Sequence, residues 1–111
     1  MIDGLTDDGE QVKMRVVVRG EGEDLSQTHP MTEAHHIDAV VVIDYSNNVL
    51  FAHRFEPSAG GKAEAAFTLP LVDRYIKPLE HCNLHGLYLG PGVHINPEHL
   101  TKRYAAKKDE L

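Results

Sequence analysis

The chain has little of several features on which secreted and membrane proteins depend. It holds one cysteine and no tryptophan among 111 residues, and only 6% of its residues are aromatic. A single cysteine excludes an internal disulfide framework and suits a reducing compartment. No apolar run approaches the roughly 20 residues of a membrane-spanning helix. The acidic start, residues 1–8, lacks the apolar segment of a signal peptide.

Positive charge is also scarce. Seventeen acidic residues against 11 lysines and arginines give a formal net charge of -6. Nucleic acids and anionic membranes attract basic surfaces, so neither is expected as a partner. The last four residues, 108–111, spell an endoplasmic-reticulum retention signal, which we interpret as coincidental because no route into the secretory pathway is visible. We therefore expect a cytoplasmic protein, and at this length a single domain, residues 1–111.

Histidine, in contrast, is abundant, with eight in the chain. Two segments hold most of them: residues 29–36 read HPMTEAHH, and residues 81–86 read HCNLHG and contain the only cysteine. Two nitrogen ligands from the first segment and the Cys/His pair of the second would make a mixed sulfur–nitrogen metal site. Such a donor set suits iron, zinc or copper rather than calcium or magnesium.

Short segments rich in β-branched residues, separated by turns, occupy the middle of the chain. We predict strands over residues 12–18, 37–45, 49–55, 63–69, 79–81 and 87–89. Residues 1–11 are polar and expected to be frayed, and residues 71–77, between two prolines, form a connection of uncertain structure. Many short strands with little helix predict an all-β protein with a β-sandwich fold.

The exception is the C-terminal end. Asn96 is suited to cap a helix, Pro97 to its first position, and Glu98 to its first turn. We therefore predict a short C-terminal helix from Glu98 to about Lys108.

The two histidine-rich segments closely resemble those of the superoxide reductase family, the desulfoferrodoxins and neelaredoxins, in the same order. The resemblance covers roughly Val12 to Leu89. It implies an immunoglobulin-like β-sandwich with its core at about residues 12–89 and a C-terminal extension over residues 90–111. It also implies one mononuclear iron per chain, Fe(2+)/Fe(3+), held by four equatorial histidines and an axial cysteine.

The family's activity is the reduction of superoxide to hydrogen peroxide, so the resemblance implies an oxidoreductase. By position, His29, His35 and His85 would be equatorial ligands and Cys82 the axial one. A rubredoxin-like protein or another small electron donor would restore the ferrous state, and a homo-oligomer is possible.

The chain departs from the family pattern at its N-terminal side. The family normally supplies its remaining histidine there, after a lysine and often a glutamate, but no histidine precedes His29 and Lys13 is the only upstream lysine. We expect the C-terminal extension to fold back over the site, with His99 or His94 as the fourth imidazole. Lys102, three residues after His99 on the predicted helix, would supply the positive charge that attracts the anion. The other interpretation is an amphipathic helix that caps the sandwich.

Other functions stay open. Three histidines and one cysteine form a closed tetrahedral set that zinc prefers, so a structural or regulatory zinc module is an alternative. A copper electron carrier usually has a methionine just after its Cys/His pair, and none follows Cys82. A metal-free thiol enzyme would pair Cys82 with a histidine base but leaves residues 29–36 unexplained. The domain could also keep the fold and the iron while acting as a subunit or sensor.

Overall fold

The computed structural model describes residues 1–19, 28–57 and 61–98. The elements in these ranges are strands, and the longest is nine residues. They are β1 (Ile2–Asp7), β2 (Gln11–Val17), β3 (Ile37–Asp44), β4 (Val49–Arg54), β5 (Glu64–Pro70), β6 (Arg74–Cys82), β7 (Gly86–Leu89) and β8 (Val93–Ile95). No helix among the described residues has the length and apolar character that a membrane crossing requires.

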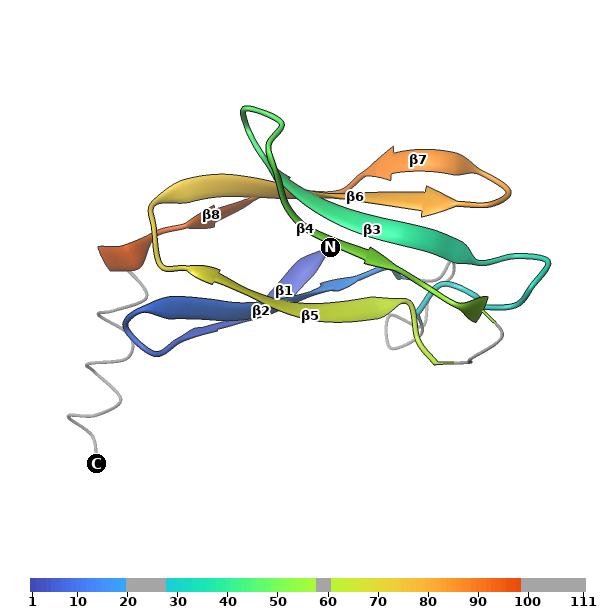
Figure 1. The fold of residues 1–111 in the computed structure, drawn as a ribbon, viewed down its shortest axis with the longest axis horizontal. Helices are drawn as coiled ribbons and strands as arrows, with labels where there is room; N and C mark the ends of the chain where they lie inside the picture. Colours follow the sequence, from blue (N-terminus) through green and yellow to red (C-terminus); the bar gives the residue numbers. More distant parts are fainter. Residues whose placement is uncertain (20–27, 58–60, 99–111) are drawn as a thin grey trace.

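The strands form two layers. One sheet has the order β1-β2-β5, and the other has the order β4-β3-β6-β7 with β8 also paired to β6. All of these pairings are antiparallel. Figure 1 shows the two sheets stacked face to face. The predicted all-β, immunoglobulin-like β-sandwich is therefore confirmed.

The core lies between the layers because side chains alternate along each strand. In β2 the inward residues Val12, Met14 and Val16 are buried, while their neighbours Lys13 and Arg15 are exposed. Facing them across the sandwich are buried residues of the five-stranded sheet: Val40, Val42, Ile76 and Ile95. Burying each of these side chains contributes about 1.5–3 kcal/mol. This core holds the ends of β3 and β6 in fixed positions.

The N-terminal segment is more ordered than its composition indicates. Residues 1–11 were expected to be frayed, and this expectation is wrong, because β1 pairs with β2 from Ile2↔Val16 to Asp7↔Val12. Ile2 is buried, and on the outer face Arg15 donates a hydrogen bond to Asp3 at 2.6 Å. The charged residues that made the segment look disordered therefore lie on the solvent side of an edge strand.

The second difference is the length of β6. The sequence predicts only a connection of uncertain structure over residues 71–77, yet β6 begins at Arg74 and continues through Pro78. The Pro78 carbonyl accepts a hydrogen bond from Gly90 at 2.9 Å, where the partner of β6 changes from β7 to β8. The N–H that proline lacks would point to that same side, so no bond to β3 is lost. Proline is tolerated in a central strand for this reason.

The C-terminal end is described only in part. Strand β8 was not expected, and it pairs with β6 between Val93↔Ile76 and Ile95↔Arg74. The helix predicted from Glu98 to about Lys108 lies outside the described residues except for its first position.

Candidate metal centre

The two histidine-rich segments meet at one end of the sandwich. Ile37, the first residue of β3, pairs with Cys82, the last residue of β6. The segment 29–36 runs directly into β3, and residues 83–85 form the turn between β6 and β7. Figure 1 shows this loop and this turn at the same end of the molecule. Antiparallel pairing of β3 with β6 thus brings together motifs that lie far apart in the sequence.

Four potential ligands converge there. The ligand atoms of His29, His35, Cys82 and His85 all lie within 4.8 Å of one another. The Cys82 Sγ lies 3.7 Å from His29 Nε2 and 3.5 Å from His85 Nδ1. The His35 ring is edge-on to both other imidazoles, with centroid distances of 4.5 Å to His29 and 5.1 Å to His85. The four residues that the sequence singled out in these two segments are therefore neighbours in space.

The donor set fits a transition-metal ion. Metal–sulfur bonds of about 2.3 Å and metal–nitrogen bonds of about 2.0–2.1 Å place a thiolate and an imidazole on one ion roughly 3–3.6 Å apart. The two sulfur–nitrogen distances are close to this range. One sulfur with three imidazole nitrogens is a set that suits iron, zinc or copper.

Burial differs across the cluster. Cys82 is only 2% exposed because it lies on the inner face of β6. His29 and His35 are half-buried, and His85, in the turn after β6, is exposed. The sulfur therefore lies on the protein side of the cluster, and one imidazole lies at the solvent side.

Two backbone contacts fix His29. Its N–H donates to the Val18 carbonyl at 2.8 Å, which attaches it to the end of β2. Its ring nitrogen Nδ1 lies 2.8 Å from the Pro30 carbonyl. A carbonyl only accepts, so Nδ1 carries the proton and Nε2 presents its lone pair toward the Cys82 sulfur. This is the tautomer that a metal ligand needs, held by the second partner that ligating histidines usually have.

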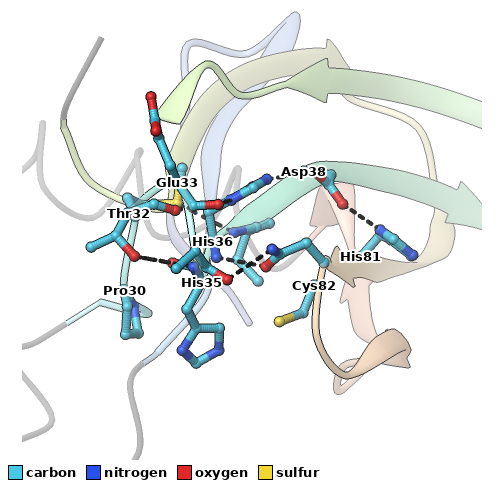
Figure 2. A network of polar contacts seen from close by, with 12 residues as sticks. Pro30, Thr32, Glu33, His35, His36, Asp38, His81 and Cys82 are labelled. Carbon is cyan, nitrogen blue, oxygen red and sulfur yellow. Dashed lines mark hydrogen bonds and ion pairs between the residues drawn. The ribbon is translucent and has the colours of Figure 1, made fainter. Parts of the chain in front are cut away.

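A small turn positions His35. Thr32 N–H donates to the His35 carbonyl at 2.9 Å, and His35 N–H donates to Thr32 Oγ1 at 3.1 Å. The reciprocal bonds close the loop on itself over four residues. In Figure 2 the His35 ring and the Cys82 sulfur lie on the same side of the network of polar contacts. Thr32 thus fixes the backbone from which this imidazole projects.

The two other histidines of these segments do not join the cluster. His36 Nε2 lies 2.8 Å from Asp38 Oδ1, and His81 Nδ1 lies 2.7 Å from Asp38 Oδ2 (Figure 2). The hydrogen bond from His81 contributes most to lowering the pKa of Asp38 below its ordinary value, and the hydrogen bond from His36 contributes less. The His81 side chain is exposed. Asp38 itself was missed, because a lone aspartate in an apolar strand gives no signal in the sequence.

The remaining candidates lie elsewhere. His94 is opposite Tyr75 on β6, with its ring stacked on Tyr75 at 4.2 Å and its Nε2 2.6 Å from Asp73. Tyr75 and Cys82 are seven residues apart on one strand, which is roughly 23 Å. The suggestion that His94 supplies the fourth imidazole is therefore wrong. His99 and Lys102 lie outside the described residues.

Comparison with known proteins gives one family. The family model for desulfoferrodoxin matches residues 2–90. A desulfoferrodoxin of Syntrophotalea carbinolica is 40% identical over 67 residues, which are 60% of this chain and 48% of the relative. A desulfoferrodoxin homolog of Archaeoglobus fulgidus is 34% identical over 88 residues, which are 75% of this chain and 65% of the relative. The chain thus spans about half to two thirds of the length of these curated relatives.

Solved structures agree on the fold. The superoxide reductase (neelaredoxin) from Archaeoglobus fulgidus in the reduced form has a TM-score of 0.66 with 22% identity, covering 86% of this chain and 87% of that chain. At this identity the likeness concerns the arrangement of strands.

Proposed function

Because the chain belongs to the desulfoferrodoxin family, we propose that it is a mononuclear iron protein that reduces superoxide to hydrogen peroxide. The proposed ligands are His29, His35, Cys82 and His85. The observation that carries the proposal is the convergence of one sulfur and three imidazole nitrogens within 4.8 Å. The family and this geometry together give a desulfoferrodoxin fold with a group of side chains that could hold a metal.

Each residue has a distinct part in this proposal. A bound iron ion would supply one electron by passing between its ferrous and ferric states. Cys82 would bind as a thiolate whose burial keeps water from the sulfur. His29 would present Nε2 in the tautomer fixed by Pro30. The exposed His85 lies at the solvent side of the cluster. A small anion could approach the metal from that side without movement of the two sheets.

For the fourth imidazole we propose His99, and for the positive charge we propose Lys102. Both residues lie beyond the part of the chain that the structure describes. A rubredoxin-like protein or another small donor would return the electron, and a homo-oligomer remains part of the proposal. A reducing cytoplasm would keep the single thiol available as a ligand.

The stoichiometry of peroxide tests the function. Reduction consumes one superoxide, one electron and two protons for each hydrogen peroxide, whereas dismutation yields one peroxide for two superoxides. Iron(II)-loaded protein should therefore give one peroxide for each superoxide consumed, with one ferrous ion oxidised for each, in a stopped-flow or pulse-radiolysis experiment. Iron that stays ferrous while superoxide decays at its uncatalysed rate would contradict the proposal.

A zinc module is the second candidate function. The same three nitrogens and one sulfur form a tetrahedral set, which zinc prefers. Metal analysis of protein purified without added metal separates the two candidates. An iron protein is coloured in its oxidised state by the bond between ferric iron and the thiolate, and a zinc protein is colourless and inert to redox reagents.

A further inference from the structure

The β3–β6 pairing contains an irregularity beside the candidate centre. Ile37 pairs with Cys82, but the next pair is Ala39 with His81, so two residues on β3 oppose one on β6. Asp38 is the extra residue. Such a bulge changes the direction of a side chain next to it. Here Ile37 and Val40 are buried while Asp38 and Ala39 between them are both half-buried, so the usual alternation is interrupted.

The bulge places the Asp38 carboxylate on the outer face of the sheet, where His81 also projects. Each carboxylate oxygen then meets a different imidazole: Oδ1 meets His36 at 2.8 Å and Oδ2 meets His81 at 2.7 Å. These two histidines are the immediate sequence neighbours of candidate ligands, since His36 follows His35 and His81 precedes Cys82. The Asp38 carboxylate therefore connects the two ligand-bearing segments on the outer face of the sheet (Figure 2).

Asn83 forms a second connection between the same segments. Its side-chain oxygen accepts from the His36 N–H at 2.8 Å, and its side-chain nitrogen donates to the Ala34 carbonyl at 3.0 Å. Its own N–H donates to the His36 carbonyl at 3.1 Å. Asn83 acts on the backbone alone, whereas Asp38 acts through two side chains. The His36 ring is also held through Nδ1, which lies 2.9 Å from the Thr32 carbonyl and 3.2 Å from the Glu33 carbonyl. Asp38 is the side chain that joins this ring to His81.

We propose that Asp38 is a positioning residue for the metal centre, which holds the backbones of His35 and Cys82 at ligand distance through His36 and His81. The inference rests on the proposed metal site. Hydrogen bonds to an ionised carboxylate are stronger than neutral ones, so the pair of contacts resists separation of the two segments. A site held in this way needs less rearrangement when a metal binds, which raises the affinity.

The competing explanation is that the contacts only join β3 to β6. In that case removing them lowers the stability of the metal-free fold but leaves the bound metal's environment unchanged. Metal affinity together with the absorption of a bound ion separates the two explanations, because a thiolate-to-metal charge-transfer band reports the geometry around the Cys82 sulfur.

The experiment compares Asp38→Ala with Asp73→Ala. Asp73 is the matched control because its carboxylate also meets one histidine, His94 at 2.6 Å, at the other end of β6. The affinity for Zn²⁺ is measured by competition with a chromophoric chelator, and the charge-transfer band is recorded on the Co²⁺-loaded protein. We expect about tenfold weaker Zn²⁺ binding in Asp38→Ala, the lower end of the range for residues outside the ligand shell. We also expect a shifted or broadened band, with Asp73→Ala equal to the parent in both measurements.

If Asp38→Ala fails to fold, Asp38→Asn replaces it in the experiment, because asparagine keeps one acceptor oxygen. We expect the Zn²⁺ affinity of Asp38→Asn to lie between those of Asp38→Ala and the parent. Parent-like Zn²⁺ affinity and an unchanged band in the folded Asp38 variant would overturn this inference alone. A parent protein that binds neither Zn²⁺ nor Co²⁺ would overturn the proposed function and this inference together.

Discussion

The imidazole of His29 shows how a single residue is prepared for coordination. Its Nδ1 lies 2.8 Å from the Pro30 carbonyl, so Nε2 is left as the acceptor 3.7 Å from the Cys82 sulfur. The acceptor belongs to the next residue in the chain, so this contact is formed within the loop itself. His94 offers a contrast, since its Nε2 is already 2.6 Å from a carboxylate.

Replacing these two histidines gives a matched test. His29→Ala removes one of four converging donors, so we expect the affinity for Zn²⁺ or Fe²⁺ to fall by more than about 100-fold, beyond the range of residues outside the ligand shell. His94→Ala should keep the parent's affinity because it lies at the far end of β6. Metal content after dialysis and a competition titration measure both. Equal losses in the two variants would contradict the assignment of His29.

At the scale of elements, β6 connects the core to the candidate centre. Its inner face carries Ile76 into the core and Cys82 into the cluster, and it pairs with three other strands. Close contact between Gly90 and Pro78 permits the change of partner from β7 to β8. A Cβ on Gly90 would lie 2.8 Å from Pro78 Cγ.

Gly90→Ala should therefore destabilise the protein. The proline ring cannot rotate away, so the backbone after β7 must shift, and we expect a loss of about 1–3 kcal/mol in the free energy of unfolding. Urea unfolding of the metal-free protein measures it. Gly9→Ala is not a suitable control because Gly9 has a positive φ. Thr68→Ala, on an exposed position of β5, should change stability by less than about 1 kcal/mol.

The turn between β3 and β4 gives a prediction on pH. Asp44 accepts hydrogen bonds from the Asn48 side chain and backbone and from the Ser46 backbone, and the Asn48 side-chain bond contributes most to lowering the pKa of Asp44 below 3.8. A carboxyl whose folded-state pKa is depressed adds stability above its unfolded-state pKa, and that stability is lost as the pH falls through the folded-state pKa.

Asp44→Asn should thus weaken the loss of stability below about pH 3.8, relative to the parent, with little change in slope between pH 5 and pH 7. The measurement is the free energy of unfolding of metal-free protein across this range. An identical pH dependence in parent and variant would show that Asp44 has the same pKa in both states.

At the scale of the whole molecule, the candidate centre joins the two layers. His29 is attached to the end of β2 through Val18, and Ala63, next to β5, donates to Thr28 at 3.4 Å, whereas Cys82 belongs to the five-stranded sheet. A metal bound by both would cross-link the sandwich at one end. Ligands that bind only the folded state stabilise it by mass action.

Metal should therefore raise the unfolding temperature. With free Zn²⁺ at about 100 times its dissociation constant, the expected gain is about 2.7 kcal/mol. Differential scanning calorimetry with and without metal measures it, and a chelator should reverse the gain. In Cys82→Ser the shift should be strongly reduced, because the serine hydroxyl is a poor ligand for these ions. An equal shift in parent and Cys82→Ser would place the stabilising metal at another site.

Net charge concerns the whole molecule as well. At -6 the protein repels an anion unless a local positive charge offsets the overall field. If Lys102 supplies it, Lys102→Ala should lower the second-order rate constant with superoxide and flatten its dependence on ionic strength. Stopped-flow rates at low and high salt measure this, with Lys13→Ala on β2 as the control. A Lys102 variant with the parent's rates at every salt concentration would remove this role.

The sequence alone determined the motifs and most of the strands. Alternation of apolar and polar residues is a local property, so β2, β3 and β4 could be predicted nearly to their ends. Asn47, in the turn between β3 and β4, has a positive φ, which asparagine tolerates better than most residues. Ligand types are also local, since the donor atoms of histidine and cysteine determine which metals they favour.

Only the tertiary structure decided what depends on pairing. Strand β1 is stable because β2 supplies its hydrogen bonds and the core covers Ile2, and neither partner is visible in the segment itself. The bulge at Asp38 exists in the register of β3 against β6, so its contact with His36 and His81 could not be foreseen from spacing. His94 is remote from Cys82 because β8 pairs with the opposite end of β6. Pairing between distant segments sets these distances, and the order of residues along the chain does not contain them.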